Sequence, residues 1–501
     1  MSKTMQRRTL SITAAFFLLF LYHSVTAQTT TPRAGANADS LTSQVSSGPA
    51  TVYGIQQCID SALKNNANVK TFEFTERTAK ANYIGQIGTM LPTLYGSANY
   101  LNNGGKSINN FTNQYVTENY NQGTGQLYGG LVLWNGFSIH NFIRQYALAY
   151  QADKKDWQYQ KDLMTINIIL DYLSVLSTEE QLNLSIIQAA DQRHRVDLMQ
   201  IQDSLGAIAP TALTDAKGLL NSIELTIVNT KNLLETNKLK LAVDMNIPYS
   251  PNMDVVNLNI DPTPAIYNAS VDQVYQNAVH NIAAIQAAEL HVASAVKGVQ
   301  ANRGNMAPTL SFQYYLTTNY STAATTSPLL STTYAQNGAY VTVNGAQVPV
   351  FAPEGTYGNL KIPFNTQFKN NFFTQVGLNL SIPILNRLTY RTAYNNSKIL
   401  LDQAIFNQKT INASLRQAVE SAYVTMVQAF RTYNVTWHEV QNYEESFRGA
   451  QVKYDAGALA SLDFVIYNTN KNNAELALIS AKYSYLLATK VLDYYQGQLT
   501  W

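Results

Sequence analysis

The segment LPTLYGSANYL at residues 91–101 returns 216 residues later as APTLSFQYYLT, at residues 307–317. The same offset aligns residues 55–92 with 271–308, whereas an offset of 251 aligns residues 205–209 with 456–460. The 35-residue difference between the two offsets falls in a single loop. Each copy reads as helix, strand, polar loop, strand, very long helix, turn and helix, so the sequence predicts a duplicated architecture.

The composition limits the classes of protein to which the chain can belong. Charged residues make up 13% of its 501 residues and the formal net charge is +2, whereas Tyr occurs 32 times. Nothing here forms the basic patch that a nucleic-acid-binding protein needs. The one cysteine, Cys58, excludes an intramolecular disulfide and is expected to be a buried helix residue.

The N-terminus has the features of a signal peptide over residues 1–27. Lys3, Arg7 and Arg8 precede an apolar run at residues 10–21, and small residues lie before Gln28. Residues 28–50 are predicted to be a flexible leader. No later stretch contains 18 consecutive apolar residues, so no transmembrane helix is expected. An exported chain of this kind is periplasmic, secreted or an outer-membrane barrel.

Four uncharged segments, at residues 93–101, 126–134, 309–320 and 372–384, show the period-2 alternation of strands. Their length and aromatic ends are typical of tilted strands that cross a bilayer, and the alternative is an ordinary half-buried sheet. The loops between paired strands, 102–125 and 321–371, are expected to be long, irregular and extracellular. One helix is predicted over residues 55–90.

The longest periodic stretches, residues 138–203 and 389–454, lack proline and predict helices about 100 Å long. Such helices are too long to pack within one compact domain, so they are expected to lie in a coiled coil. Gly206 and Gly457 are predicted to end them, with return helices starting near Thr211 and Ser461. Heptad-like seams support this interpretation: Leu163, Ile166, Leu170 and Leu173; Val419, Tyr423, Met426, Phe430, Tyr433 and Trp437; Leu220, Ile223, Ile227, Thr230 and Leu234; Leu476, Ile479, Tyr483 and Leu486. A further short strand is predicted over residues 255–260.

The chain resembles the TolC-like outer-membrane efflux proteins, the outer membrane factors of tripartite efflux and type I secretion systems. The resemblance rests on the duplicated order of elements, the Leu-Pro turn at residues 91–92, the SIPI segment at 381–384, and Tyr454 three residues before Gly457. It implies an α+β membrane protein that forms a homotrimer. A 12-stranded transmembrane β-barrel would stand on a long periplasmic helical coiled-coil barrel.

The resemblance also divides the chain and names its partners. Residues 51–248 would form the first efflux repeat, 249–268 an equatorial linker and 269–501 the second repeat. The trimer would sit in outer-membrane lipid and give passive exit to substrates delivered by an inner-membrane transporter and a periplasmic adaptor.

In the family the tunnel narrows at the helical turns, where carboxylates line the aperture. Asp463 falls on an aperture position and Tyr454 on a tyrosine that holds the closed state. The other carboxylates near the turns, which are further candidates, are Asp203, Asp215 and Asp455. Three positions depart from the family pattern: Ile466 replaces a second aperture Asp, Leu459 replaces an Arg, and Ala212 occupies the position equivalent to Asp463. The alternative for each Asp is a solvated or helix-capping side chain.

The turns are apolar at their tips, which is unusual for soluble hairpins and suggests docking to a partner. Gly206 and Ile208 in the first turn, and Gly457 and Leu459 in the second, are therefore candidates for contact with the adaptor that the resemblance implies.

No enzyme chemistry is indicated. The six histidines show no metal-binding spacing, and no phosphate loop or nucleophile motif occurs, so no cofactor or metal is expected. His194 is interpreted as part of a polar helix face. The alternatives to a conduit are a periplasmic coiled-coil structural or adaptor protein without a barrel, and an independent surface porin or receptor.

Overall fold

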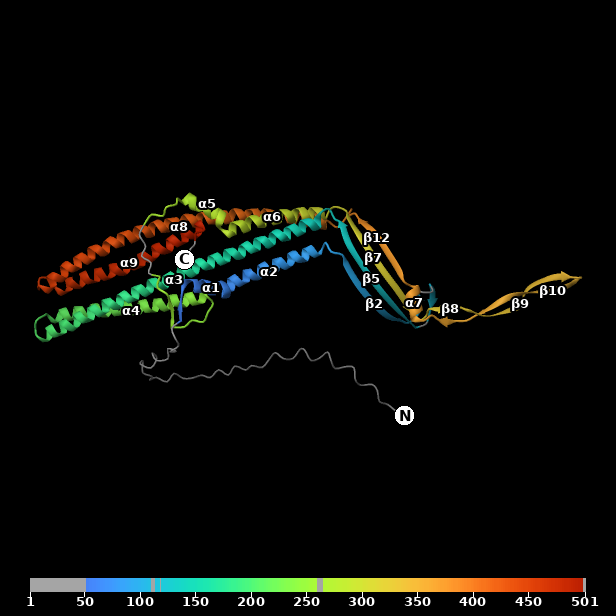
Figure 1. Ribbon diagram of the computed structural model, residues 1–501, viewed down its shortest axis with the longest axis horizontal. Coiled ribbons are helices and arrows are strands. Elements are labelled where there is room, and N and C mark those ends of the chain that lie inside the picture. Colours follow the sequence, from blue (N-terminus) through green and yellow to red (C-terminus); the bar gives the residue numbers. More distant parts are fainter. Residues whose placement is uncertain (1–50, 110–112, 118, 259–264, 499–501) are drawn as a thin grey trace, which may run out of the picture. The chain divides into compact units, whose positions relative to one another are not determined.

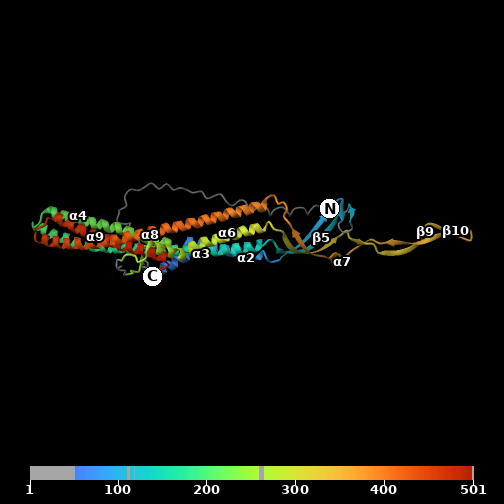
Figure 2. The same ribbon diagram turned by 90° about the horizontal axis from the view of Figure 1, so that it is seen from above.

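The computed structural model describes residues 51–109, 113–117, 119–258 and 265–498. Contacts group residues 50–501 into one compact unit, in which the long helices and the main sheet lie at opposite ends (Figures 1 and 2). The predicted signal peptide and leader lie outside the described residues. No helix among those described is long and apolar enough to cross a bilayer. The repeat boundaries at 248 and 268 remain predictions.

The main sheet has four antiparallel strands in the order β12-β7-β5-β2. They are β2 (Thr93–Asn103), β5 (Tyr120–Trp134), β7 (Thr309–Ser321) and β12 (Phe373–Ser381). The four predicted strands are thus confirmed, although β5 begins six residues earlier and β12 ends three residues earlier than expected. Each copy of the repeat supplies two neighbouring strands.

The register gives this sheet one apolar and one largely polar face, because paired residues lie on the same side and successive residues alternate. No strand of the four contains a charged residue. The apolar face carries Leu94, Leu127, Leu131, Phe312, Tyr314, Leu316, Val376, Leu378 and Leu380. The other face carries Ser97, Asn99, Thr124, Gln126, Ser311, Gln313, Thr317, Gln375 and Asn379, together with Tyr95, Tyr128 and Tyr315.

The second long loop is not irregular, contrary to the sequence prediction. It contains an antiparallel hairpin of β9 (Leu329–Val343) and β10 (Ala346–Tyr357), which extends away from the main sheet (Figure 1). Short strands β8 (Thr325–Thr326) and β11 (Leu360–Lys361) join its base, and α7 (Phe364–Asn370) leads back to β12. The hairpin sequence is rich in Thr, Tyr and Val, but its polar and apolar residues alternate only weakly. Its composition therefore led to the prediction of an irregular loop. In the first loop, β3 (Ser107–Asn109) pairs with β4 (Gln114–Val116).

The helix predicted over residues 55–90 is two helices, α1 (Ile55–Asn65) and α2 (Ala67–Gly88). Asn66 adopts an extended backbone between them, and its side chain caps α2 by accepting hydrogen bonds from the amides of Asn68 and Val69. The second copy breaks at the equivalent residue, Ile282, between α5 (Val271–Asn281) and α6 (Ala283–Gly304).

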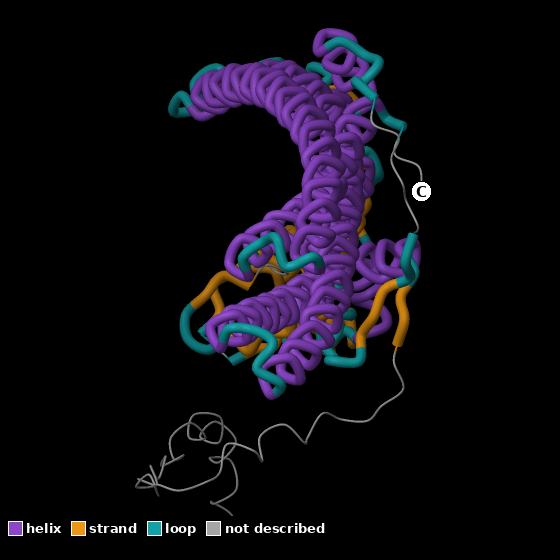
Figure 3. The backbone as a smooth tube through the Cα atoms, turned by 90° about the vertical axis from the view of Figure 1, so that its left-hand side faces the viewer, coloured by secondary structure: helices purple, strands orange, loops and turns teal. Residues whose placement is uncertain are grey.

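The two longest helices, α3 (Ser138–Ser204) and α8 (Thr389–Asp455), contain 67 residues each and confirm the prediction. Gly206 and Gly457 follow them with φ of 67° and 71°, the left-handed conformation that glycine adopts without strain. The return helices are α4 (Pro210–Asp244) and α9 (Ser461–Gln496). In the half nearer the main sheet, the helices contact one another in the order α2-α3-α6-α8, which parallels the strand order. Seen along the long axis, the helices form an open arc (Figure 3).

The predicted seams are largely buried. Val419, Met426 and Tyr433 join one apolar cluster, while Leu173 and Leu234 join another. Trp437 is the exception, since 48% of its surface is exposed.

The middle of the unit is closed by a parallel pair of β1 (Thr51–Tyr53) and β6 (Met253–Val255). The prediction of a strand over residues 255–260 was therefore wrong apart from Val255, the last residue of β6. Residues 259 and 260 lie outside the described chain. The fully buried Tyr172 of α3 donates a hydrogen bond of 2.6 Å to the carbonyl of Val256. Cys58 is fully buried nearby, as predicted, and burial raises the pKa of its thiol to about 12.

Candidate functional site at the hairpin tips

The two helical turns lie together at the end of the unit farthest from the sheet (Figure 1). They have the same backbone geometry. The amide of Ala207 donates to the carbonyl of Gln202, and the amide of Ala458 donates to that of Lys453, each at 2.8 Å. These bonds satisfy helix-end carbonyls around the left-handed glycine. The tip region, defined here as residues 195–220 and 447–468, therefore consists of two similar turns with different side chains.

Tyr454 connects the two hairpins. Its ring stacks on Phe464 of α9, with 4.6 Å between the ring centroids. Its hydroxyl lies 3.8 Å from the sulfur of Met199 on α3, and the ring packs against the cluster of Met199 and Ala212. Burial, reinforced by the neighbouring Asp455, raises the pKa of Tyr454, so the phenol is neutral in this position. The tyrosine selected from the sequence is thus part of a contact between hairpins.

Arg195 of α3 makes a second connection that sequence reasoning missed. Its Nη1 atom donates a 2.7 Å hydrogen bond to Oε1 of Gln451 on α8. Its guanidinium carbon also lies 5.1 Å from the ring centroid of Phe464 and 5.7 Å from that of Phe447. Gln451 in turn donates 2.8 Å to Asp455. The sequence places no Arg after Gly457, but an arginine from the opposite hairpin supplies the cation here.

A cavity of about 150 Å³ lies between the hairpins beside these contacts. Arg195, Gln451, Tyr454, Asp455 and Phe464 contribute to its lining. The contact between the tips is therefore incompletely filled, which leaves room for the hairpins to shift.

The four candidate carboxylates occupy different environments. Asp463 is exposed in the first turn of α9, and Asp215 is half-buried near the start of α4. Asp203 and Asp455 lie in the last turns of α3 and α8, where the helix dipole disfavours negative charge. Within the described residues, none of the four forms an ion pair with a basic side chain. The N-cap residues of α9 and α4 are Ala460 and Ala209, so neither Asp463 nor Asp215 caps its helix, and only Asp463 lies in a first turn, where the helix dipole favours a carboxylate.

The positions that depart from the family pattern lie as follows. Ile466 is exposed on α9, Leu459 is half-buried in the turn, and Ala212 is buried between the hairpins. An aspartate at position 212 would lie in an apolar cluster, which explains why this hairpin carries its carboxylate at Asp215 instead.

The apolar turns are exposed at most positions, as predicted, and their two largest side chains are the exceptions. Ile208 and Leu459 are half-buried, and Ile208 packs on the cluster that contains Met199. The exposed apolar surface lies beside them, at Leu205, which is 77% exposed, and at Leu462. His194, interpreted as part of a polar face, is indeed exposed.

Comparison with known proteins agrees with this architecture. Residues 274–498 match the family described as outer membrane efflux protein. A search of the curated proteins found no match. Crystal structures of CusC share 15% identity at a TM-score of 0.70, with 88% of this chain and 91% of that chain covered.

Two further solved structures have the same fold. The CmeC outer membrane channel of Campylobacter jejuni shares 17% identity at a TM-score of 0.67, covering 89% of this chain and 86% of the other. The open state of the MtrE outer membrane channel of Neisseria gonorrhoeae shares 16% identity at a TM-score of 0.67, and 89% of each chain is covered.

Proposed function

We propose that this chain, a member of the outer membrane efflux protein family, is one subunit of a trimeric channel that lets substrates leave through the outer membrane. The family consists of efflux proteins, not enzymes, so the chain itself hydrolyses nothing. In this proposal a periplasmic adaptor and an inner-membrane transporter deliver the substrate and supply the energy. The sheet lies in the membrane, and the helices lie in the periplasm.

The observation that carries the proposal is the two-faced, charge-free sheet. An apolar face matches hydrocarbon and a polar face matches a water-filled lumen, which is the alternation of transmembrane barrels. Leu378 on the apolar face is 68% exposed in the single chain, and nothing in the described residues covers its strand. A periplasmic coiled-coil protein would leave this apolar surface in water, so the sheet disfavours that alternative.

Adjacent residues on β12 give a matched test, because Leu378 lies on the apolar face and Asn379 on the polar face. A lysine on the lipid side costs about 2–4 kcal/mol near the bilayer centre, whereas a lumen lysine changes mainly ion selectivity. Leu378→Lys is therefore expected to reduce assembled protein in outer-membrane fractions, and Asn379→Lys to assemble normally. Equal tolerance of both variants would contradict the assignment of the faces.

Open edges support a trimer. β2 and β12 each pair on one side only, and a sheet edge in lipid leaves backbone groups unsatisfied. The helical layer is open in the same way: Phe74 on α2 is 58% exposed and Phe406 on α8 is 68% exposed. Three arcs placed edge to edge would close a 12-stranded barrel and cover both helix edges.

The proposed contact between copies can be tested by cross-linking. Phe74 lies about 21 Å along α2 from the sheet end, and Phe406 about 26 Å along α8, so the two are at similar height. The double variant Phe74→Cys, Phe406→Cys is expected to form disulfide-linked oligomers up to trimers, since the native Cys58 is buried. Each single variant is the control. An uncrosslinked double variant would argue against this interface.

At the other end, the tip carboxylates are proposed to form the aperture. Three-fold repetition of Asp463, together with Asp455, Asp203 and Asp215, would give rings of negative charge that bind cations. The contacts of Arg195 and Tyr454 with the opposite hairpin would hold the aperture closed. Opening then requires the hairpins to separate at the 150 Å³ cavity.

The adaptor is proposed to dock on the same tips. Gly206 and Gly457 shape the turns, Ile208 and Leu459 cover their interior, and Leu205 offers exposed apolar surface to a partner.

A further inference from the structure

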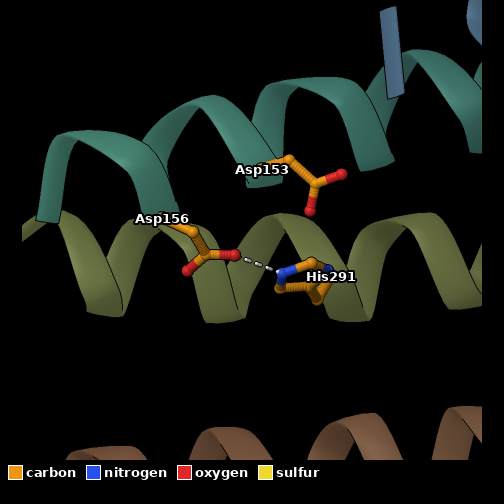
Figure 4. Close-up of side chains that lie close together, drawn as sticks. All are labelled: Asp153, Asp156 and His291. Atoms are coloured by element: carbon orange, nitrogen blue, oxygen red, sulfur yellow. Dashed lines mark hydrogen bonds and ion pairs between the residues drawn. The ribbon is translucent and has the colours of Figure 1, made fainter. Parts of the chain in front are cut away.

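A second cluster of titratable side chains lies away from the tips, in the half of the helices nearer the main sheet. Asp153 and Asp156 extend from α3, and His291 extends toward them from α6 (Figure 4). One ligand atom from each of the three lies within 4.8 Å of the others. Asp153 and Asp156 are half-buried, and 44% of the His291 side chain is exposed. This cluster could not be predicted from the sequence, because its members come from different repeats and Asp156 and His291 are 135 residues apart.

We propose that Asp153, Asp156 and His291 bind a divalent transition-metal ion, with Zn²⁺ as the representative, that joins α3 to α6. One imidazole nitrogen and two carboxylate oxygens are a ligand set that suits Zn²⁺ and similar ions better than Ca²⁺ or Mg²⁺, which prefer oxygen alone.

The distances fit such an ion after a small adjustment. Nε2 of His291 lies 2.9 Å from Oδ2 of Asp156. Two ligands of a tetrahedral Zn²⁺, with bonds of about 2.1 Å, are separated by about 3.4 Å, so these two atoms would move apart by about 0.5 Å. Because the three ligand atoms lie within 4.8 Å of one another, some point is at most about 2.8 Å from each, so movements of under about 1 Å complete the site.

The charges of the cluster also require a cation. Among the described residues, neither aspartate pairs with a lysine or arginine, and Asp153 makes no hydrogen bond. Desolvation raises the pKa of Asp153, and the hydrogen bond that the imidazole of His291 donates to Asp156 raises the pKa of His291. Within the described part of the chain, the imidazole of His291 is thus the one basic side chain at ion-pair distance from the cluster's carboxylates. A divalent ion would neutralise both and release the proton of His291.

The surrounding packing holds the ligands in place. On the same side of α6, Ser294 donates a 2.9 Å hydrogen bond to the carbonyl of Gln145 on α3. Gly298, one turn further on, packs directly against the Gln145 side chain. Helices this closely joined present their side chains at fixed spacing, which a preorganised metal site needs. The ion would connect the first repeat to the second, between the middle of the unit and the main sheet.

The test uses the full chain in detergent, without a histidine tag, after treatment with a chelator. Zn²⁺ alone is titrated by calorimetry, and the melting temperature is measured with and without it. The wild type is expected to bind one Zn²⁺ per chain and to melt at a higher temperature with the ion. Asp153→Asn and His291→Gln should each weaken binding by about 10-fold or more, since each removes one of three ligands.

Two comparisons separate a metal site from a simple ion pair. Asp153→Asn leaves the contact between His291 and Asp156 in place, so a structural ion pair alone would make this variant behave as the wild type. Asp162→Asn removes another aspartate of α3, which accepts a hydrogen bond from Gln158 at 2.7 Å outside the cluster, and should bind Zn²⁺ normally. Absence of stoichiometric binding, or equal binding by Asp153→Asn and the wild type, would overturn the proposal.

Discussion

Replacing Arg195 with alanine should favour the open state of the proposed aperture. The side chain makes one charge-assisted hydrogen bond, to Gln451, and contacts the rings of Phe447 and Phe464. A hydrogen bond to a charged group contributes about 1.5–3 kcal/mol, and each cation–π contact about 0.5–1 kcal/mol. Arg195 is half-exposed, so solvent screening reduces the total to about 2 kcal/mol per chain. If opening breaks these contacts, the ratio of open to closed channel should rise about 30-fold per chain.

Recording from single channels in a planar bilayer measures this ratio directly. Arg193→Ala is the matched control, because Arg193 lies two residues away but binds Glu224 of α4, within its own hairpin, at 2.6 Å. It should leave the open fraction unchanged. Arg195→Lys keeps the charge without the planar group and should fall between the wild type and Arg195→Ala.

Size-exclusion chromatography of each variant checks assembly before recording, so that a folding defect is not read as gating. An unchanged open fraction in assembled Arg195→Ala, or an equal rise in Arg193→Ala, would refute the assignment of Arg195 to the closed state.

Two further predictions concern charge. Asp463→Ala should weaken block of the channel by multivalent cations, because an anionic ring loses its ligands; unchanged block in bilayer recordings would remove Asp463 from the aperture. Burial raises the pKa of Asp171, which is 3% exposed, from 3.8 to about 6, with a hydrogen bond to Asp244 as a further cause and Lys240 opposing the shift. The folded state therefore binds this proton more tightly, so its contribution to the free energy of unfolding is complete below pH 3.8 and is lost as the pH rises through about 6. Asp171→Asn should remove that part of the pH dependence of melting between pH 4 and 7, and identical slopes for variant and wild type would contradict it.

The parts of the fold that follow from local signals could be predicted from the sequence. The absence of proline over residues 138–203 and 389–454 gives both long helices to within one residue, and Gly206 and Gly457 give their ends. Alternation without charge locates the four strands. These signals depend on neighbours in the sequence alone.

The parts that sequence reasoning missed depend on distant contacts. Asn66 lies among other polar residues in an amphipathic stretch, and its side chain donates a hydrogen bond to the carbonyl of Asp244, 178 residues away in another helix. Arg195 meets Gln451, and His291 meets Asp156, across separations of 256 and 135 residues. Helical periodicity places such side chains on a face but does not identify the residue opposite, so neither contact was predictable.

The two copies have long helices of equal length but different side chains at the tips. The two long helices have equal lengths, yet Arg195, Tyr454 and Phe464 correspond, at the offset of 251, to Ser446, Asp203 and Leu213 of the other copy. A ring of six hairpins with identical tips would have identical contacts throughout. Arg195 and the hydroxyl of Tyr454 both join α3 to the α8–α9 hairpin of the same chain. In the proposed trimer, the contact within a chain would therefore differ from the contact between chains. If the proposed trimer opens at its tips, the hairpins would then separate along one type of boundary first, and the substitutions that weaken closure should lie on that boundary.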